Sequence, residues 1–136
     1  MRRNLAISLT LVIASALVIV AALPAPGQQK PMAERKILLR QDLPMPGYEV
    51  VQALGIIQPG GREGKHTHPG MMVAYVLEGA VTMAIEGGPT VTYKAGDSYV
   101  IQPGVVHEGI NNGKIEYKGE VTYIVEKGKP LTSQVP

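Results

Sequence analysis

The 136-residue sequence contains no cysteine, no tryptophan and no phenylalanine. Without cysteine, neither a disulfide framework nor a lipoprotein anchor can form. Without Phe and Trp, a hydrophobic core has to be built from Val, Ile, Leu, Met and Tyr, a composition that suits β-strands. No helical hydrophobic period occurs after the first 27 residues, and the length allows a single domain. We therefore expect one all-β domain.

An excess of charge of one sign is also lacking once the N-terminal segment is set aside. Removal of Arg2 and Arg3 from the 13 basic residues leaves 11, which equals the 11 acidic residues. Nucleic-acid-binding domains normally carry a clustered basic face, and no basic run is present here. We expect no nucleic-acid partner.

Residues 1–27 have the pattern of an export signal. A short basic start, Met1–Asn4, precedes an uncharged apolar run from Leu5 to Leu23, and small residues follow at Ala25–Gly27. This order predicts a hydrophobic export helix, a signal peptide cleaved before Gln28. Because ~20 apolar residues span a bilayer, an uncleaved membrane anchor is the alternative. Both readings predict an exported domain, periplasmic or secreted, with membrane contact only through this segment.

Turn residues divide the rest of the chain into short β-rich runs. Residues 28–47 are predicted to form an extended arm with one strand, Lys36–Gln41, because prolines exclude a helix there. Further strands are expected at Tyr48–Gln58, Met71–Leu77, Ala80–Glu86, Thr90–Lys94, Ser98–Gln102, Val105–Ile110 and Ile115–Glu126. Turn signals every 8 to 12 residues are typical of a β-sandwich or barrel. We place the barrel at residues 48–128 and a C-terminal tail at 129–136.

All three histidines lie in two segments rich in Gly and Pro. Residues i and i+2 of a strand share a face, so His66 and His68 can reach one point together. His107 can return on a neighbouring strand. Three neutral imidazoles that converge from adjacent strands make a site for a divalent transition metal: Fe, Mn, Ni, Cu or Zn. The alternative is that they are ordinary barrel residues, hydrogen-bonded to their neighbours.

Two spaced motifs resemble those of the cupins, in particular small single-domain bacterial cupins. The first, G-x5-H-x-H-x3-E-x6-G, is matched by Gly60, His66, His68 and Gly79. The second, G-x5-P-x-G-x2-H-x3-N, is matched by Gly96, Gly104, His107 and Asn111. The resemblance covers about residues 36–128. It implies a double-stranded β-helix, or jelly-roll, barrel that holds one divalent metal through three histidines and a glutamate, and it implies a homodimer.

By this resemblance His66, His68 and His107 are the metal ligands, and Met72 stands at the position of the usual glutamate. A thioether in place of a carboxylate removes a negative charge and a hard oxygen ligand, which shifts preference from Mn toward Cu. Met72 can also simply pack beside the metal, as methionine does in irregular cores. A third reading is that the metal is lost and an apolar cavity for a small molecule remains.

No nearby carboxylate is expected to replace the glutamate. Glu63 lies in a loop, Glu78 lies at a hairpin, and Glu108 should face the opposite side from His107. Asn111 is expected to close a turn. The tyrosines are expected to be structural, with at most one or two reaching the cavity as proton donors: Tyr75, Tyr93, Tyr99, Tyr117 and Tyr123.

The expected function is that of an extracytoplasmic metal-binding cupin with a three-His site. Open positions on the metal would bind a small-molecule ligand or substrate, and a catalytic version would be a dioxygenase or an isomerase. The alternative is a non-catalytic protein that binds a small ligand or a soft metal such as copper. Because proteins with the same fold carry out many different reactions, only the residues of the site can distinguish these two functions.

Overall fold

The structure, a computed structural model, describes residues 32–136. The predicted signal peptide or anchor, residues 1–27, lies outside them. The described part of the chain forms ten β-strands and no helix, so the all-β prediction is confirmed. Among these residues no helix is long and apolar enough to span a membrane.

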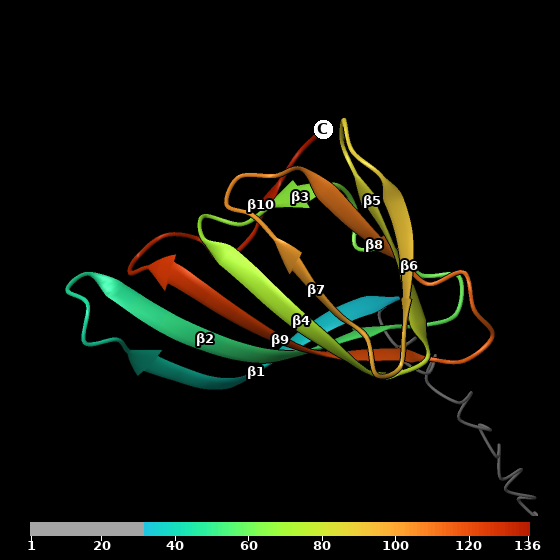
Figure 1. The fold of residues 1–136 in the computed structure, drawn as a ribbon, viewed down its shortest axis with the longest axis horizontal. Helices are drawn as coiled ribbons and strands as arrows, with labels where there is room; N and C mark the ends of the chain where they lie inside the picture. The colour runs from blue at the N-terminus through green and yellow to red at the C-terminus, as the bar shows by residue number, and fades with distance from the viewer. Residues whose placement is uncertain (1–31) are drawn as a thin grey trace, which may run out of the picture.

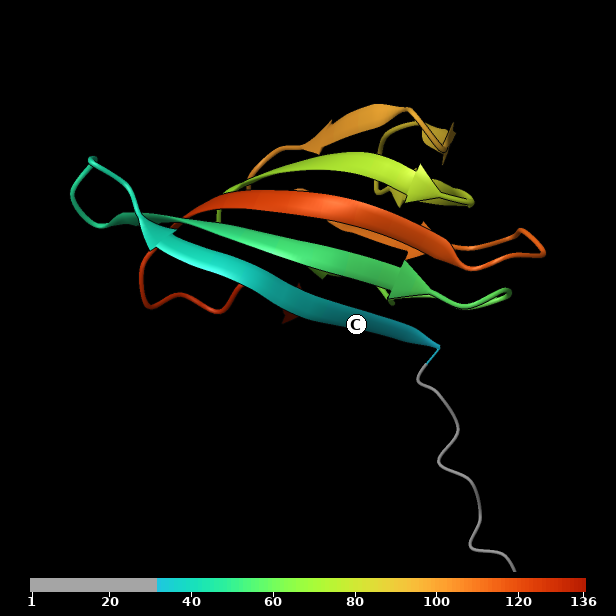
Figure 2. The same cartoon turned by 90° about the horizontal axis from the view of Figure 1, so that it is seen from below.

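The strands form two antiparallel five-stranded sheets. The first sheet has the order β1 (Ala33–Asp42), β2 (Tyr48–Ile57), β9 (Tyr117–Glu126), β4 (Met71–Glu78) and β7 (Ser98–Ile101), side by side in Figure 2. The second has the order β10 (Ser133–Gln134), β3 (His66–Thr67), β8 (His107–Ile110), β5 (Ala80–Ile85) and β6 (Thr90–Lys94). From β2 onward the chain passes repeatedly from one sheet to the other, which gives a jelly-roll arrangement (Figure 1).

The core lies between the sheets and follows from the two-residue period of the strands. Strands β2 and β9 alternate strictly between buried and half-buried residues. Their inward positions carry Val51, Ala53, Val121 and Val125, none more than 6% exposed. Such alternation is typical of a sheet with one face packed on a core. The residues predicted for the core, without Phe or Trp, are therefore sufficient to fill it.

The two ends of the chain differ from the sequence-based interpretation. The single strand predicted in the arm extends over Ala33–Asp42 and pairs with β2 along its length, with an irregularity between Ile37 and Leu39. In the predicted tail, Ser133 pairs with Thr67 and Gln134 with His66. Periodicity cannot detect a two-residue strand, since a pattern needs several repeats.

Gly70, which precedes β4, leaves no room for a side chain beside the backbone of β9. A Cβ atom built on it would lie 2.0 Å from the carbonyl oxygen of Ile124 and 2.9 Å from Cγ1 of Val125. Because the carbonyl belongs to a central strand, it cannot move aside without shifting the sheet. Only glycine fits here.

We predict that Gly70→Ala lowers the free energy of unfolding by about 2–4 kcal/mol, measured by urea denaturation, because the added methyl group separates β4 from β9. Gly55→Ala is the matched control. Its new Cβ would meet its nearest neighbours at 3.8 Å, an ordinary contact. That variant should stay within about 1 kcal/mol of the unchanged protein. Equal losses in both variants would contradict the explanation.

Candidate metal centre

Three histidine rings meet inside the barrel. His66 on β3 and His107 on β8 are directly paired across the antiparallel register. The ring centroids of His66 and His107 are 4.4 Å apart, and His68 lies 4.9 Å from each of them. All three are 1–2% exposed. One possible ligand atom from each lies within 4.8 Å of the other two. The predicted convergence of the three imidazoles is thus observed.

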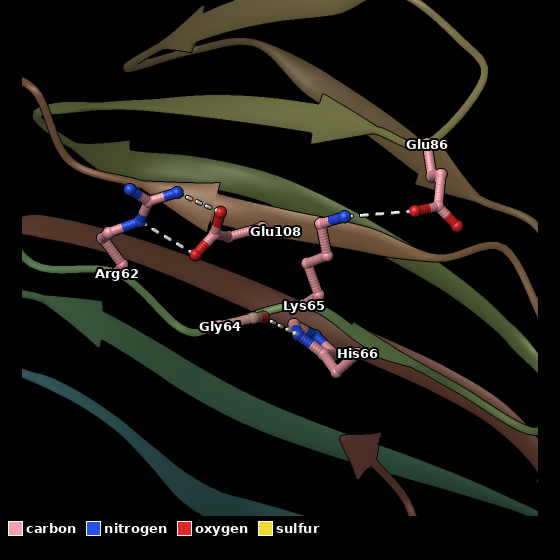
Figure 3. A network of polar contacts seen from close by, with 6 residues as sticks. All are labelled: Arg62, Gly64, Lys65, His66, Glu86 and Glu108. Atoms are coloured by element: carbon pink, nitrogen blue, oxygen red, sulfur yellow. Dashed lines mark hydrogen bonds and ion pairs between the residues drawn. The ribbon is translucent and has the colours of Figure 1, made fainter. Parts of the chain in front are cut away.

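A backbone carbonyl orients each ring. The Nδ1 atom of His66 lies 2.8 Å from the oxygen of Gly64 (Figure 3), that of His68 lies 2.8 Å from Leu131, and that of His107 lies 2.9 Å from Val105. Because a carbonyl oxygen can only accept, each Nδ1 must donate its hydrogen. Each neutral ring therefore keeps a lone pair on Nε2, the atom available for a metal.

The Nε2 atom of His68 supplies a direct test of whether a metal fits. Among residues 32–136 it is the one buried side-chain nitrogen or oxygen without a hydrogen-bond partner. A buried acceptor without a partner destabilises a fold, and such atoms in native proteins call for an explanation. Beside the three rings is a cavity of about 20 Å³, which has room for about one water molecule or one ion. The donor set and the space both fit a first-row transition metal.

Burial keeps the imidazoles in the form that binds metal. It lowers the pKa of His68 to about 3, against the opposing effect of the hydrogen bond to the Leu131 carbonyl. Burial is also the main reason why the pKa values of His66 and His107 are lowered. A metal ligand has to be neutral imidazole, so no proton has to be displaced near neutral pH.

Met72, on β4, is 4% exposed and lines the cavity with the three histidines. Three tyrosines line it as well, more than the one or two expected: Tyr99, Tyr117 and Tyr123. The hydroxyl groups of Tyr99 and Tyr117 are 3.1 Å apart. Burial raises the pKa of Tyr117 to about 12. These phenols therefore remain protonated; one of the two hydrogens is donated within the pair, and the other can be donated into the cavity.

Glu63 also lines the cavity, although its loop position indicated no role. Arg62 forms an isolated antiparallel bridge with Ile110, so this part of the loop runs beside β8 as a strand would. The Arg62 side chain turns outward and pairs with Glu108 (Figure 3). Glu63 turns inward and packs so closely on Gly109 that a Cβ there would lie 2.5 Å from its Oε2 atom. Loop sequences lack a period, which is why this residue was missed.

The direction predicted for Glu108 is confirmed, since its carboxylate accepts from Arg62 rather than lining the cavity. Burial raises the pKa of Glu63, and the charge of Arg35 is the largest opposing effect.

Arg35 is a further residue of the cavity wall that the sequence analysis did not identify. Its guanidinium lies 5.4 Å from the centre of the Tyr123 ring and donates to Oγ1 of Thr132 at 2.5 Å. On β1, alternate residues such as Ala33 and Arg35 are half-buried, whereas their neighbours are exposed. Arg35 stands among Glu34, Lys36 and other charged residues of β1, and no sequence signal distinguishes it from a surface residue.

Asn111 lies outside the cavity and closes a turn, as predicted. Its Nδ2 atom donates to the carbonyl oxygens of Ile57 and Ile115 at 2.8 and 2.9 Å, and its Oδ1 atom accepts from the amide of Gly113 at 2.8 Å. The second-motif asparagine is therefore structural.

Comparison with known proteins agrees with this geometry. Residues 53–118 match the family model described as the cupin domain. No curated protein matches the sequence. Among solved structures, an uncharacterized conserved protein with a double-stranded β-helix domain from Klebsiella pneumoniae superposes with a TM-score of 0.62 at 21% identity, covering 84% of this chain and 90% of that one.

Two further solved structures have the same fold. A cupin superfamily protein from Desulfitobacterium hafniense has a TM-score of 0.58 at 14% identity, covering 76% of this chain and 84% of its own. An oxalate oxidase in complex with the substrate analogue glycolate has a TM-score of 0.60 at 21% identity, covering 82% of this chain and 59% of its own. The family match and the shared jelly-roll topology show that the barrel of this chain is a cupin domain.

Proposed function

We propose that His66, His68 and His107 hold one divalent transition metal and that this metal acts on a small oxygenated molecule. The observation that carries the proposal is the buried, unpartnered Nε2 atom of His68 beside two rings oriented in the same way. When bound, the metal would supply Lewis acidity or activation of O2. Three protein ligands would leave an open position, as in catalytic metal sites.

The residues around the three histidines support a chemical role for this position. Tyr99 and Tyr117 are buried phenols that can donate hydrogen bonds, and Glu63 adds a carboxyl group at the cavity wall. Met72 and the neighbouring valine and methionine side chains exclude water from the rest of the cavity. This combination suits a dioxygenase or an isomerase better than a purely structural metal site, which normally has four protein ligands.

A non-catalytic carrier of a soft metal is the second candidate, and Met72 is the observation that favours it. Its side chain is buried at the same cavity as the three histidines. Thioether sulfur is a ligand for Cu(I), whereas Mn and Mg prefer oxygen. Under this alternative the metal would be bound without turnover.

We further propose that the protein is exported and forms a homodimer. Export rests on the leader pattern of residues 1–27. Assembly is supported by the outer face of the first sheet, where Val73, Tyr75 and Val100 are 39–48% exposed. A second copy would cover these apolar side chains.

We predict that His66→Ala and His107→Ala each weaken metal binding by more than about 100-fold, because losing a ligand should cost more than the 10–100-fold typical of its hydrogen-bond partners. Elemental analysis of dialysed protein measures the metal, and circular dichroism checks that the β-fold persists. Asn112→Ala, an exposed loop change, is the control. Full metal retention in both histidine variants would rule out the site.

Substitutions of Met72 separate the two candidate functions. Met72→Glu should tighten binding of Mn²⁺ or Fe²⁺, because it restores a hard oxygen ligand and a negative charge. Met72→Leu, which removes the sulfur but keeps the volume, should leave metal affinity within about threefold if Met72 only packs. A large loss of Cu(I) affinity in Met72→Leu would identify the methionine as a ligand and favour the carrier. Competition with a chromogenic chelator measures each affinity.

The metal-free protein should become less stable as pH falls below about 6.5, where the histidines of the unfolded chain take up protons. In the folded protein all three pKa values are lowered, that of His68 to about 3. The unfolded state therefore binds more protons between these limits, and stability present above pH 6.5 is lost progressively toward pH 3. Thermal unfolding across this range measures the loss. His68→Asn should flatten the pH dependence, and an unchanged slope would contradict the assignment.

A further inference from the structure

A second hollow, of about 290 Å³, opens beside the histidine cavity. Arg35, Glu63 and His66 line both spaces, so they form the boundary between them. Thr132, from the segment before β10, lies at the hollow with Arg35. Glu34 lines the hollow too, so a molecule that approaches the three imidazoles from this side passes one cationic and two acidic side chains.

Arg35 has hydrogen-bond donors without a protein acceptor at this boundary. Among residues 32–136 it forms no ion pair, and only the hydroxyl groups of Thr132 and Tyr123 accept hydrogen bonds from its five N–H groups. The contact with the Tyr123 ring and the hydrogen bond to Thr132 hold the guanidinium in place. A guanidinium that is fixed in advance pairs with a carboxylate through two parallel hydrogen bonds at a reduced entropic cost.

Glu63 is the only acidic residue that lines the histidine cavity in the described part of the chain. The backbone amide of Gly109 lies within hydrogen-bonding reach of its carboxyl group, and no described side chain donates to it. Oxygen lone pairs therefore remain available for a ligand. The family's carboxylate is replaced by Met72, so a divalent ion with Arg35 would leave the site net positive even when the negative charges of Glu63 and Glu34 are both counted. A positive site favours an anion.

We propose that Arg35 and Glu63 select the ligand of the three-His site as a small hydroxy acid. Its carboxylate pairs with the Arg35 guanidinium in the outer hollow, and its neighbouring hydroxyl group donates to Glu63. The inference rests on the proposed function, because the hydroxyl end is directed toward the metal position. The inner space of about 20 Å³ has room only for the metal, so the hydroxyl group stays at the boundary beside Glu63.

The test uses the purified protein loaded with Zn²⁺, which is redox-inert, and isothermal titration with lactate. Propanoate lacks the hydroxyl group and 1,2-propanediol lacks the carboxylate, so lactate should bind at least about tenfold more tightly than either. Inorganic phosphate tests whether any oxyanion suffices. Phosphate binding as tight as that of lactate would overturn the assignment of a hydroxy acid.

Arg35→Gln should weaken lactate binding by about tenfold or more while the zinc content stays unchanged. Lys36→Gln is the matched control, because it removes one positive charge from the adjacent, exposed position of the same strand. If circular dichroism shows that the glutamine variant misfolds, Arg35→Lys is tested in its place. Lysine keeps the positive charge but lacks the planar guanidinium, so this variant should retain only part of the lactate affinity. Equal lactate affinity in Arg35→Gln and the unchanged protein would overturn the proposal.

Glu63→Met, which removes the acceptor oxygens, should abolish the preference for lactate over propanoate, whereas a preserved preference would overturn the role of Glu63. If the proposed metal site is wrong, the unchanged protein will bind no zinc, and this outcome is distinct from the loss of lactate binding. In that case the same titration on the metal-free protein decides: lactate binding that depends on Arg35 supports the anion site, and binding that does not overturns it.

Discussion

The orientation of three imidazole rings by three backbone carbonyls is the interaction on which the rest of this site depends. Each carbonyl accepts from an Nδ1–H and leaves the opposite nitrogen with a free lone pair inside the barrel. Two of these carbonyls are local, at Gly64 and Val105, but the third belongs to Leu131, 63 residues from His68. The C-terminal segment is thus part of the candidate metal centre, and its two-residue strand β10 holds it beside β3.

The charges around the site do not come from the fixed positions of the two cupin motifs. The motif position that normally supplies a carboxylate carries Met72, whereas Glu63 reaches the cavity from a loop and Arg35 from the edge strand β1. In a buried site whose other lining side chains are uncharged, one cation and one acid have a large influence on which molecules can enter, because a low-dielectric interior strengthens their fields. The scaffold is common to many cupins, but this pair gives the entrance its own chemistry.

Much of the fold could be predicted because turns are marked locally. The strand predicted at Thr90–Lys94 has the bounds that the structure shows, and Tyr48–Gln58 and Ser98–Gln102 differ from the observed strands by one residue. Gly and Pro near the ends of these runs account for this success, since their backbone preferences act over two or three residues. Strand β10 was missed because pairing with β3, rather than any local preference, keeps it extended.

The sequence by itself determined the two spaced motifs, and with them the β-barrel and the three histidines as a group, because a two-residue period places His66 and His68 on one side of the chain. It could not determine which other side chains join them. Tertiary structure alone decided that Glu63 turns inward while Arg62 turns outward, that Arg35 caps the cavity, and that three tyrosines reach it. The physical reason is that a side chain in a loop or on an edge strand takes its direction from the strand packed against it, and that strand is distant in sequence.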